Sequence, residues 1–470
     1  MSIFKTKFRA ICTLFAVILT ILLVVPGVRN AASRQIAAIV RGHATVLDFG
    51  ATGNGSADDS VAIQTAIDAG TGDIVFPRGI YKLQKTVTIN LDRVGFTSLS
   101  GQGTARIVMA GPGPAFRFIG SHGGTAEPKT VKPEVWKNER SPLIDGLEFT
   151  GEHPEADAIE ANGTMQLTVT RVNIRGVRHG IRLIERNRNV LIANSHIYHN
   201  TGAGIYLDHV NLHQTNINGC HVSYNGGGGV VVRGGEVRNV HINGCDIEGN
   251  MAINGPPSAN VWFDCDNGSF AEVAIVGCTI QHDSKSPNSA NIRIQGKGVF
   301  PRKGEILPVN CGHFTIADNV LSDVKVNVEM RGARGVTIVG NTFWQGYEHN
   351  LLVEDCSQVV VGANMMERNP MYGYAAEANN SIVFRNSTDC TVSGLHVHNI
   401  RESKAGIVFD HCERFNINNC TVLDCEGGGL LLQDVRNSRV SNCFIRDDRP
   451  NAGKTQAIRV VGGSGNKIEE

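Results

Sequence analysis

The sequence has few aromatic residues, no net charge and, after residue 28, no long apolar run. Aromatic side chains make up 6% of the 470 residues, and 44 basic side chains balance 44 acidic ones. Nucleic-acid-binding proteins usually carry a basic surplus, so this balance argues against that class of partner. The lack of later apolar runs argues against a chain that crosses a membrane several times. A hydrophobic content of 41% argues against a disordered chain.

Glycine, by contrast, is abundant, with 54 residues in the chain. Average proteins contain about 7% glycine, so this share of about 11% indicates many tight turns. The length allows either two or three ordinary domains or a single elongated repeat array.

The N-terminus has the features of an export signal. Three basic residues before residue 10 precede an uncharged apolar run that ends at residue 28. We interpret residues 1–30 as a signal peptide. The run is also long enough to cross a bilayer, so an uncleaved membrane anchor is the alternative. In either case we expect residues 31–470 to be secreted or otherwise to lie outside the cytoplasm.

A short pattern recurs from residue 147 onward: a small or polar residue, any residue, and then an apolar residue, as in Ser195-His196-Ile197. Eight of the eleven spacings between the apolar positions are 22 to 25 residues. These anchor residues are Phe149, Ile174, Ile197, Val222, Ile247, Ile280, Leu321, Phe343, Met366, Val397, Val422 and Ile445.

Two further alternating patterns keep step with the anchors, for example Ile205-Tyr206-Leu207 and Val240-His241-Ile242. Each repeat therefore contains three short strands and no helix. Such strands share a core only when successive repeats stack, about 4.8 Å apart. We predict an all-β, single-stranded parallel β-helix with about twelve coils over residues 147–465. Leucine-rich repeats and propellers fit less well, because the first need a leucine grid and a helical side and the second need longer antiparallel blades.

Five cysteines share one inward register in this repeat: Cys220, Cys245, Cys278, Cys420 and Cys443. We interpret them as a stack of small buried side chains, because free cysteine is among the most buried residue types. A disulfide between adjacent coils is the alternative, since the coil spacing would permit one.

Residues 46–90 form a predicted N-terminal cap. Asp58 suits the N-cap of a short helix, Ile63 and Ile67 fall at helical spacing, and Gly70 can close the helix. This helix would cover the first coil, whose edge would otherwise expose unpaired strand groups. At the other end, residues 458–470 show no capping helix, so we expect a second subunit to cover the last coil.

The stretch from residue 46 to residue 83 resembles the N-terminal signature of the pectate-lyase-like superfamily, which includes rhamnogalacturonases, polygalacturonases, alginate epimerases and many tailspike proteins. The resemblance implies a right-handed β-helix over residues 31–470 and a carbohydrate-active protein. The acidic catalytic motifs of polygalacturonases fall where this chain has Asp157 and His179. The resemblance therefore implies catalytic roles for these two residues, whereas the epimerase active-site motif and its calcium-binding repeats are absent.

Residues that alternate with the apolar core positions of the first strand must point outward. One outward row reads Glu160, Arg182, Tyr206, Val231, Trp262, Arg293 and Glu329. The next reads Asn162, Ile184, Asp208, Arg233, Asp264, Gln295, Arg331, Glu354, Arg385 and Asp410. The catalytic candidates on this face are Asp157, Glu160, His179, Arg182, Asp208, Arg233 and Asp264, with Tyr206 and Trp262 as substrate-binding candidates.

Aromatic rings among carboxylates and arginines suit a sugar acid. Asp208 and Asp264 lie two coils apart, about 9.6 Å by strand spacing, which fits the wide separation of carboxyls in inverting hydrolysis. Alternatively, Arg233 between them could assist proton abstraction beside a uronate carboxylate, which leads to β-elimination. These charged rows can also be interpreted as an exposed salt-bridge ladder without a function. We apply that interpretation to the later charged residues of the second row, because they lack neighbouring aromatic residues.

The third strands present His196, His221 and Asp246 outward on successive coils. Two imidazoles and a carboxylate could hold a divalent metal, and a solvated polar row explains them equally well. No cofactor is certain from the sequence, although Ca²⁺ is compatible with it. His209 and His213 fall in a predicted loop with nothing to orient them.

Long loops at residues 248–259, 281–290, 367–380 and 446–456 all fall at the same corner of the coil and could wall a groove along the first-strand face. We predict an exported protein that acts on an anionic polysaccharide as a lyase or hydrolase. The second hypothesis is a non-catalytic surface protein that binds glycans or partner proteins. No nucleic-acid partner is expected.

Overall fold

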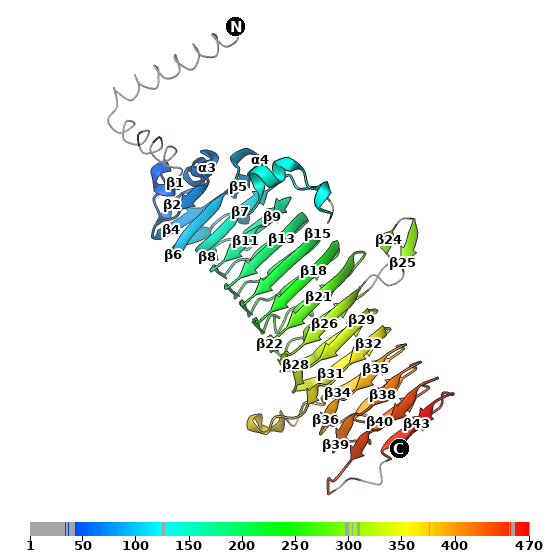
Figure 1. Ribbon diagram of the computed structural model, residues 1–470. Helices are drawn as coiled ribbons and strands as arrows, with labels where there is room; N and C mark the ends of the chain where they lie inside the picture. Colours follow the sequence, from blue (N-terminus) through cyan, green and yellow to red (C-terminus); the bar gives the residue numbers. More distant parts are fainter. Residues whose placement is uncertain are drawn as a thin grey trace.

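The protein is an elongated stack of strands that winds from one end of the chain to the other (Figure 1). The computed structural model describes Ser33, Ile36 and residues 43–124, 127–296, 300–302, 304–307, 311–375, 377–450, 452 and 456–469. Within this part of the chain, 42 strands join one sheet. No helix among these residues is long and apolar enough to cross a bilayer. The predicted signal or anchor at residues 1–30 lies outside the described residues.

The strands form three parallel columns along the rod. The first column carries β5 (Val87–Asn90), β7 (Gly113–Ile119), β9 (Ala156–Asn162), the start of β13 (Ile181–Ala193), the start of β15 (Ala203–Asn218), β17 (Gly228–Arg233), β20 (Ala259–Asp264), β23 (Ala290–Gln295), β28 (Val324–Arg331), β31 (Gly346–Glu354), β34 (Ser381–Arg385), β37 (Ile407–Asp410), β40 (Leu430–Gln433) and β43 (Ile458–Val461).

The second column carries β1 (His43–Thr45), β3 (Asp73–Val75), the starts of β6 (Ser98–Met109) and β8 (Leu143–Gly151), β11 (Thr168–Thr170), the ends of β13 and β15, β18 (Glu236–Asn243), β21 (Ser269–Val276), β26 (Gly312–Ala317), β29 (Arg334–Val339), β32 (Ser357–Val361), β35 (Thr391–Ser393), β38 (Asn416–Asn418), β41 (Arg439–Ser441) and β44 (Lys467–Ile468).

The third column carries β2 (Asn54–Asp58), β4 (Gly79–Leu83), the ends of β6 and β8, β12 (Asn173–Arg175), β14 (His196–Tyr198), β16 (His221–Ser223), β19 (Asp246–Glu248), β22 (Thr279–Gln281), β27 (Val320–Ser322), β30 (Thr342–Phe343), β33 (Met365–Met366), β36 (His396–His398), β39 (Thr421–Leu423) and β42 (Phe444–Arg446). A short strand, β10 (Thr164–Met165), pairs with β13, and β24 (Phe300–Arg302) forms an antiparallel hairpin with β25 (Glu305–Leu307).

The pairing confirms the predicted parallel β-helix. Phe149 pairs with Ile174, Ile174 with Ile197, and each of the twelve anchor residues pairs with the next one along the chain. Residues some two dozen positions apart in the sequence are therefore direct neighbours. This register follows from side chains that alternate between a buried and an exposed face, because a slip by one residue would expose every apolar anchor.

Buried polar side chains stack along the rod as well. Asn250 donates to Asn260 (2.9 Å), and Asn260 donates to Asn291 (2.8 Å). The same contact repeats between successive members of one ladder, which comprises Asn200, Asn225, Asn250, Asn260, Asn291, Asn327 and Asn350. Each amide thereby satisfies the next, which is the condition for burying such groups at little cost.

The cysteine row is buried in the same way. Cys220, Cys245 and Cys278 are at most 3% exposed, and the Cys220 N–H lies 3.5 Å from the Cys245 sulfur. All cysteines in the described part of the chain are free, which favours the stack over the disulfide alternative. Cys420 is buried as well, whereas Cys443, near the C-terminal end of the rod, is only partly buried. At the corner before this row, Asn194 (φ 51°) and Gly219 (φ 58°) take the left-handed conformation that the sharp turn requires.

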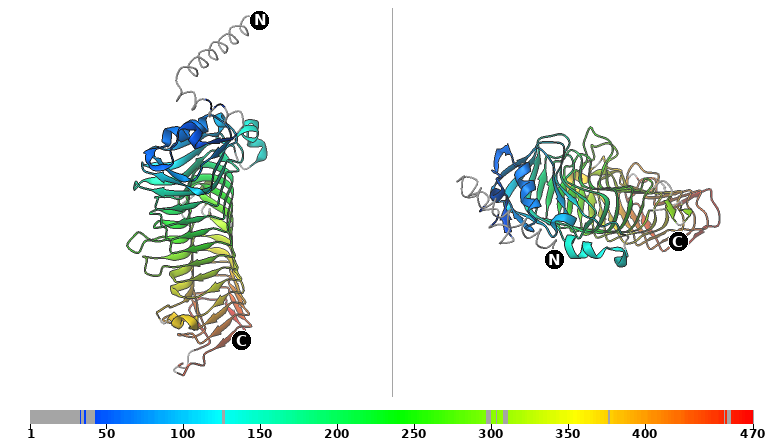
Figure 2. Two further views of the ribbon diagram at one scale, coloured as in Figure 1. Left: turned by 90° about the vertical axis from the view of Figure 1, so that its left-hand side faces the viewer. Right: turned by 90° about the horizontal axis from the view of Figure 1, so that it is seen from above.

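The N-terminal cap contains two short helices, α3 (Ser60–Asp68) and α4 (Leu91–Val94), at the blue end of the rod (Figure 2). Helix α3 buries Ile63, Ala66 and Ile67, as the spacing predicts. Its N-cap is Asp59 and not Asp58. The Asp58 carboxylate instead accepts hydrogen bonds from the Ser60 N–H (3.0 Å) and the Gln84 N–H (3.2 Å). Parallel pairing already begins at β1.

The last described coil is open to solvent. Val460 and Val461 in β43 are 44% and 50% exposed. The expectation that a second subunit covers this edge stays a prediction.

Candidate functional site

The first-strand face carries both predicted outward rows in the predicted register. In the parallel strand register, Glu160 lies opposite Arg182 and Arg182 lies opposite Tyr206. The row continues through Trp262 to Glu329. Asp208 and Asp264 lie opposite Arg233 in the strands on either side of it. The two aspartates are therefore two coils apart on the same face. The second row continues in the same way to Asp410.

Ion pairs join the N-terminal members of these rows. Glu160 Oε1 accepts from Arg117 Nε (2.6 Å), and Glu160 Oε2 lies 3.3 Å from Arg182 Nη1. Arg182 Nε in turn donates to Asp208 Oδ2 (3.0 Å). Burial alone would raise the pKa of Asp208, but hydrogen bonds from Arg182 and His209 outweigh it and lower that pKa. These residues converge as a continuous network.

Asp157 and His179 lie beside this network. Asp157 is 1% exposed and accepts a bidentate pair from Arg178 (2.9 and 2.7 Å) together with the His179 N–H (2.9 Å). His179 Nδ1 accepts from the Ala203 N–H (3.0 Å), and its ring lies 5.1 Å from the Tyr206 ring. Burial lowers the pKa of His179 and raises that of Tyr206 to about 12, so both rings are neutral at neutral pH.

Sequence reasoning was wrong about His209. This residue and His213 lie within β15, not in a loop. His209 Nδ1 and Asp208 Oδ1 are 2.7 Å apart, and Nε2 lies 4.0 Å from Asp266 Oδ2. Gly234 makes room for the ring, because a Cβ at that position would lie 2.5 Å from the imidazole. The adjacent Asp-His pair was the available signal, since a carboxylate beside an imidazole can orient it.

Trp262 marks the change to the later coils. The Arg233 guanidinium lies 5.0 Å from the centroid of the indole ring, and the Arg293 guanidinium lies 5.7 Å from it. Arg233 Nε is also 3.3 Å from Asp264 Oδ2. The indole N–H donates to Gln295 (3.2 Å), which fixes the ring between the two arginines.

A groove with a volume of about 600 Å³ begins at Trp262. It follows β20, β23, β28, β31 and β34 and is lined by Pro257, Trp262, Asn288, Arg293, Gln295, Val326, Glu329, Arg331, Glu348, His349, Leu352, Glu354 and Arg385. Pro257 and Asn288 belong to two of the loops that we expected to form walls. Of the residues predicted as catalytic or substrate-binding, Trp262 alone lines this groove.

Arginines and glutamates alternate along the groove. Glu329 accepts from Arg293 (2.6 Å) and Arg331 (3.0 Å), and Glu354 pairs with Arg331 (2.7 Å) and Arg385. The side chains of Arg331 and Arg385 are 51% and 47% exposed, whereas those of Glu329 and Glu354 are 9% and 8% exposed. Glu348 also lines the groove, with its side chain 49% exposed and 3.3 Å from Lys325. Two exposed arginines thus accompany one exposed glutamate, and the accessible charge of the lining is positive overall.

His349 adds a titratable ring to the same groove. Its Nδ1 lies 2.6 Å from the Ser381 hydroxyl, which donates its own proton to the Glu348 carbonyl (2.5 Å). Nδ1 must then carry the proton, and Nε2 carries the lone pair. Burial lowers the pKa of His349, so this neutral form persists at neutral pH. Glu329 and Glu354 stood in the predicted outward rows, whereas His349 was not singled out, because its contact with Ser381 depends on side-chain placement that the repeat does not encode.

The predicted metal candidates form a smaller arrangement than expected. His196 Nδ1 and His221 Nδ1 are 3.5 Å apart, and His221 pairs with Asp246 in the neighbouring coil. Over the described ranges, no group of three or more histidine, cysteine or acidic side chains is placed to hold a metal ion.

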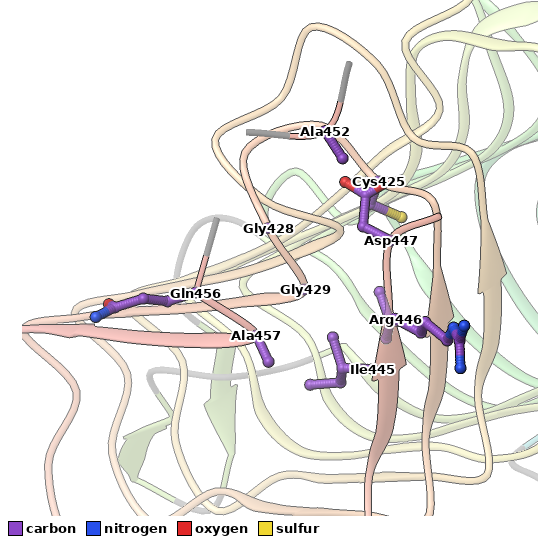
Figure 3. Close-up of a pocket in the computed structure, with 10 residues that line it drawn as sticks. Cys425, Gly428, Gly429, Ile445, Arg446, Asp447, Ala452, Gln456 and Ala457 are labelled. Atoms are coloured by element: carbon purple, nitrogen blue, oxygen red, sulfur yellow. The ribbon is translucent and has the colours of Figure 1, made fainter. Parts of the chain in front are cut away.

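Two other cavities lie away from the first-strand groove. One of about 510 Å³ at a corner is lined by His199, Tyr224, Ile253 and His282, among others, and the His199 and Tyr224 rings stack 5.2 Å apart. The other, of about 170 Å³, lies near the C-terminal end between Cys425, Ile445 and Asp447 (Figure 3). Asp447 there is bound by Arg449 (2.8 and 2.6 Å), so its charge is already compensated.

Comparison with protein families agrees with this architecture. The model described as "Right handed beta helix region" matches residues 135–280 and 380–470, together just over half of the chain. "Rhamnogalacturonase A/epimerase, pectate lyase-like" matches residues 44–117, and "Periplasmic copper-binding protein (NosD)" matches residues 266–397. No curated protein matches the chain.

Solved structures share the fold at low sequence identity. A mutant of the tailspike protein of E. coli bacteriophage HK620, in complex with a pentasaccharide, is 12% identical, with a TM-score of 0.50 over 92% of this chain and 82% of that chain. The Dettilon tailspike protein is 13% identical, with a TM-score of 0.50 over 90% of this chain and 69% of that chain. Such similarity shows the fold alone.

Proposed function

Because the chain belongs to the pectate-lyase-like superfamily of right-handed β-helices, we propose that it binds and cleaves an acidic, uronate-containing polysaccharide outside the cytoplasm. The observation that carries the proposal is the groove of about 600 Å³ on the first-strand face, with an indole ring at one end and exposed arginines along it. An aromatic face stacks on a sugar ring, and arginine binds carboxylates through paired N–H donors.

The charge of the groove supports an anionic ligand. Arg331 and Arg385 each expose about half of their side chain although they also contact Glu354. Each guanidinium group has five N–H donors, more than these contacts occupy. A uronate carboxylate can therefore bind these guanidinium groups at little cost to the protein.

Elimination is the chemistry that the groove supports best. It requires a base that removes the proton beside the uronate carboxylate, after which the glycosidic C–O bond breaks, a C=C bond forms and the departing oxygen gains a proton. His349 Nε2 supplies an unprotonated nitrogen in the groove, and an arginine beside the carboxylate stabilises the charge that develops. Hydrolysis would instead need a carboxyl group that is free to donate a proton. Glu329 and Glu354 are occupied by arginines, and Glu348 lies 3.3 Å from Lys325.

The candidates upstream of the groove extend this site along the polymer. Glu160, Arg182, Tyr206 and Asp208 lie on the same face as Trp262, in register with it. We assign them to contacts with neighbouring sugar units, with Asp157 and His179 holding Arg178 and the strand ends in place. Ca²⁺ binding stays a prediction from the sequence.

The occupied carboxylates also support a second candidate function, binding without cleavage. Incubation with a panel of uronate polymers separates the two. Elimination gives unsaturated ends that absorb ultraviolet light, hydrolysis gives new reducing ends without that absorbance, and a binding protein gives neither while it retains the polymer. We expect unsaturated ends from the wild type and none from His349→Gln, with polymer affinity unchanged.

The histidine row of the third strands provides a matched control for this variant. His196→Gln removes an exposed imidazole on another face and should leave the rate of cleavage unchanged. New reducing ends without unsaturation, or full activity in His349→Gln, would contradict elimination at this site.

The extracytoplasmic location has two supports. The basic residues and apolar run at the N-terminus are typical of an export signal. The family model that matches residues 266–397 describes a periplasmic protein.

A further inference from the structure

A second cluster of charged and titratable side chains lies away from the groove, at the N-terminal end of the rod. His122 is 2% exposed and belongs to the segment between β7 and β8. Its backbone N–H donates to Gly163 O (3.0 Å), and the Gly163 N–H donates to Arg186 O (2.5 Å). The coil of Gly163 therefore lies between those of His122 and Arg186, and the Arg186 charge still acts on the His122 ring.

Arg186 is only partly bonded. Its Nη1 donates to the Asn211 side-chain oxygen. Nε and Nη2 are buried and have no hydrogen-bond partner among the described residues. These two nitrogens form the edge of the guanidinium group that binds two oxygens of one anion side by side. A guanidinium group keeps its charge in proteins, so it cannot escape the cost of burial by losing a proton.

Two histidines with unused ring nitrogens lie close enough to Arg186 and Arg188 for both charges to act on them. Both ring nitrogens of His122 and Nδ1 of His213 are buried without a partner in the part of the chain that the structure describes. His213 pairs in register with Arg188, two residues from Arg186. Burial, followed by the charges of Arg186 and Arg188, lowers the pKa of His122 to about 4. Each neutral ring can donate one N–H to an acceptor without adding a charge.

The nearby carboxylates are engaged elsewhere. Glu139 accepts from the Ser121 N–H (2.6 Å) and the Ser121 hydroxyl (2.5 Å). Glu236 lies 3.7 Å from Arg238. No carboxylate in the described structure forms an ion pair or hydrogen bond with Arg186, although the charge of Glu236 acts on it from a distance.

We propose that His122, Arg186 and His213 form a buried oxyanion site, in which Arg186 Nε and Nη2 bind two oxygens of one anion and the histidines donate to the others. The ligand chemistry is a compact anion with at least two oxygens on one centre: inorganic sulfate or phosphate, or the carboxylate of a sugar acid. The site lies where β13 passes from the first column to the second, and it does not depend on the function proposed for the groove.

The test is calorimetric titration of the whole protein, at constant pH and ionic strength, with sodium sulfate, sodium phosphate and sodium D-galacturonate in separate experiments. Sodium chloride is the control salt, because chloride offers no paired oxygens. We expect the titration to show saturable binding of at least one oxyanion. In thermal unfolding near saturation, we expect Tm to rise by on the order of 3 °C, since a ligand that binds only the native state stabilises it. Binding of sulfate or phosphate identifies a tetrahedral inorganic ligand, and binding of galacturonate alone identifies a sugar carboxylate.

Arg186→Gln should weaken the binding at least tenfold. Arg171→Gln is the matched control, because Arg171 is an exposed arginine on a neighbouring coil that pairs with Asp145, and this variant should bind as the wild type does. His122→Phe tests the same site with a milder change should Arg186→Gln fail to fold. Equal responses to all four salts, or an unchanged affinity in both Arg186→Gln and His122→Phe, would overturn the proposal.

Discussion

The two halves of the first-strand face are built from the same alternating charges, and they differ in what surrounds those charges. In the N-terminal half, Glu160 and Asp208 are linked through Arg182 into a ladder. In the later half, Trp262 and two loop residues, Pro257 and Asn288, flank a comparable series of ion pairs, and a groove results. Both halves contain alternating charges and an aromatic ring, Tyr206 or Trp262, so the loop walls are the feature that gives the later half a groove.

The same buried asparagine ladder runs beneath both halves. Interrupting it should have the largest effect, a loss of stability. Asn260→Leu leaves the Asn250 side chain and the Gln281 carbonyl without their partner. We expect a loss of about 3 kcal/mol in the free energy of unfolding, measured by urea denaturation. Asn416→Leu, at an exposed strand position, is the control and should change stability by less than about 0.5 kcal/mol. Equal effects of the two variants would show that the ladder does not stabilise the rod.

The next effect separates the two halves. Trp262→Ala removes the ring that lies between Arg233 and Arg293. We expect the affinity for a uronate oligosaccharide to fall roughly thirtyfold, equivalent to about 2 kcal/mol. Tyr206→Ala is the matched change in the N-terminal half and should lower affinity less than about threefold. Titration of both variants decides the point, and a larger loss for Tyr206→Ala would move the binding site upstream.

A smaller effect concerns the arginines. Arg331→Gln removes an exposed guanidinium from the groove, whereas Arg117→Gln removes one from the upstream ladder. We expect Arg331→Gln to weaken binding about tenfold and to reduce its dependence on salt, because screening acts on the charge that is lost. Arg117→Gln should alter neither quantity. Measurements at two ionic strengths test this, and identical salt dependence in the wild type and Arg331→Gln would argue against charge recognition.

The smallest expected effect is a change in protein stability caused by substituting Asp208, in the N-terminal half of the first-strand face. Arg182 and His209 lower the pKa of Asp208, so its charge stabilises the fold above its unfolded pKa, roughly 3.9. That stability is lost as the pH falls through the lower, folded-state value. Asp208→Asn should cost about 1 kcal/mol at neutral pH, and the difference from the wild type should shrink below about pH 4. A difference that grows in acid would contradict this assignment.

The sequence predicted the fold in more detail than the site. The anchors from Phe149 to Ile445 pair as their spacing indicated, because the period of the repeat and the alternation of apolar residues encode the register directly. The N-cap was misplaced by one residue, since Asp58 and Asp59 offer the same side chain and only the path of the backbone separates them.

The position of the groove along the first-strand face was harder to predict than its loop walls, two of which were identified from the sequence. Arg331, Glu354 and Arg385 were assigned to a ladder without neighbouring aromatics, and the alternation alone gave no reason to place the groove beside them. His349 sits where β31 enters the first column, and its partner Ser381 comes from the next coil. Contacts of that kind depend on side-chain placement, which periodicity does not encode. His209 shows the same limit, as its orientation requires both Asp208 and the space above Gly234.

The most direct test of the proposed groove is a crystal structure of the protein with a bound uronate oligosaccharide. We predict a sugar ring against Trp262 and carboxylates beside Arg331 and Arg385, with His349 facing the carbon next to one carboxylate. An oligosaccharide bound instead along Glu160, Arg182 and Asp208, or on another face of the rod, would contradict the account.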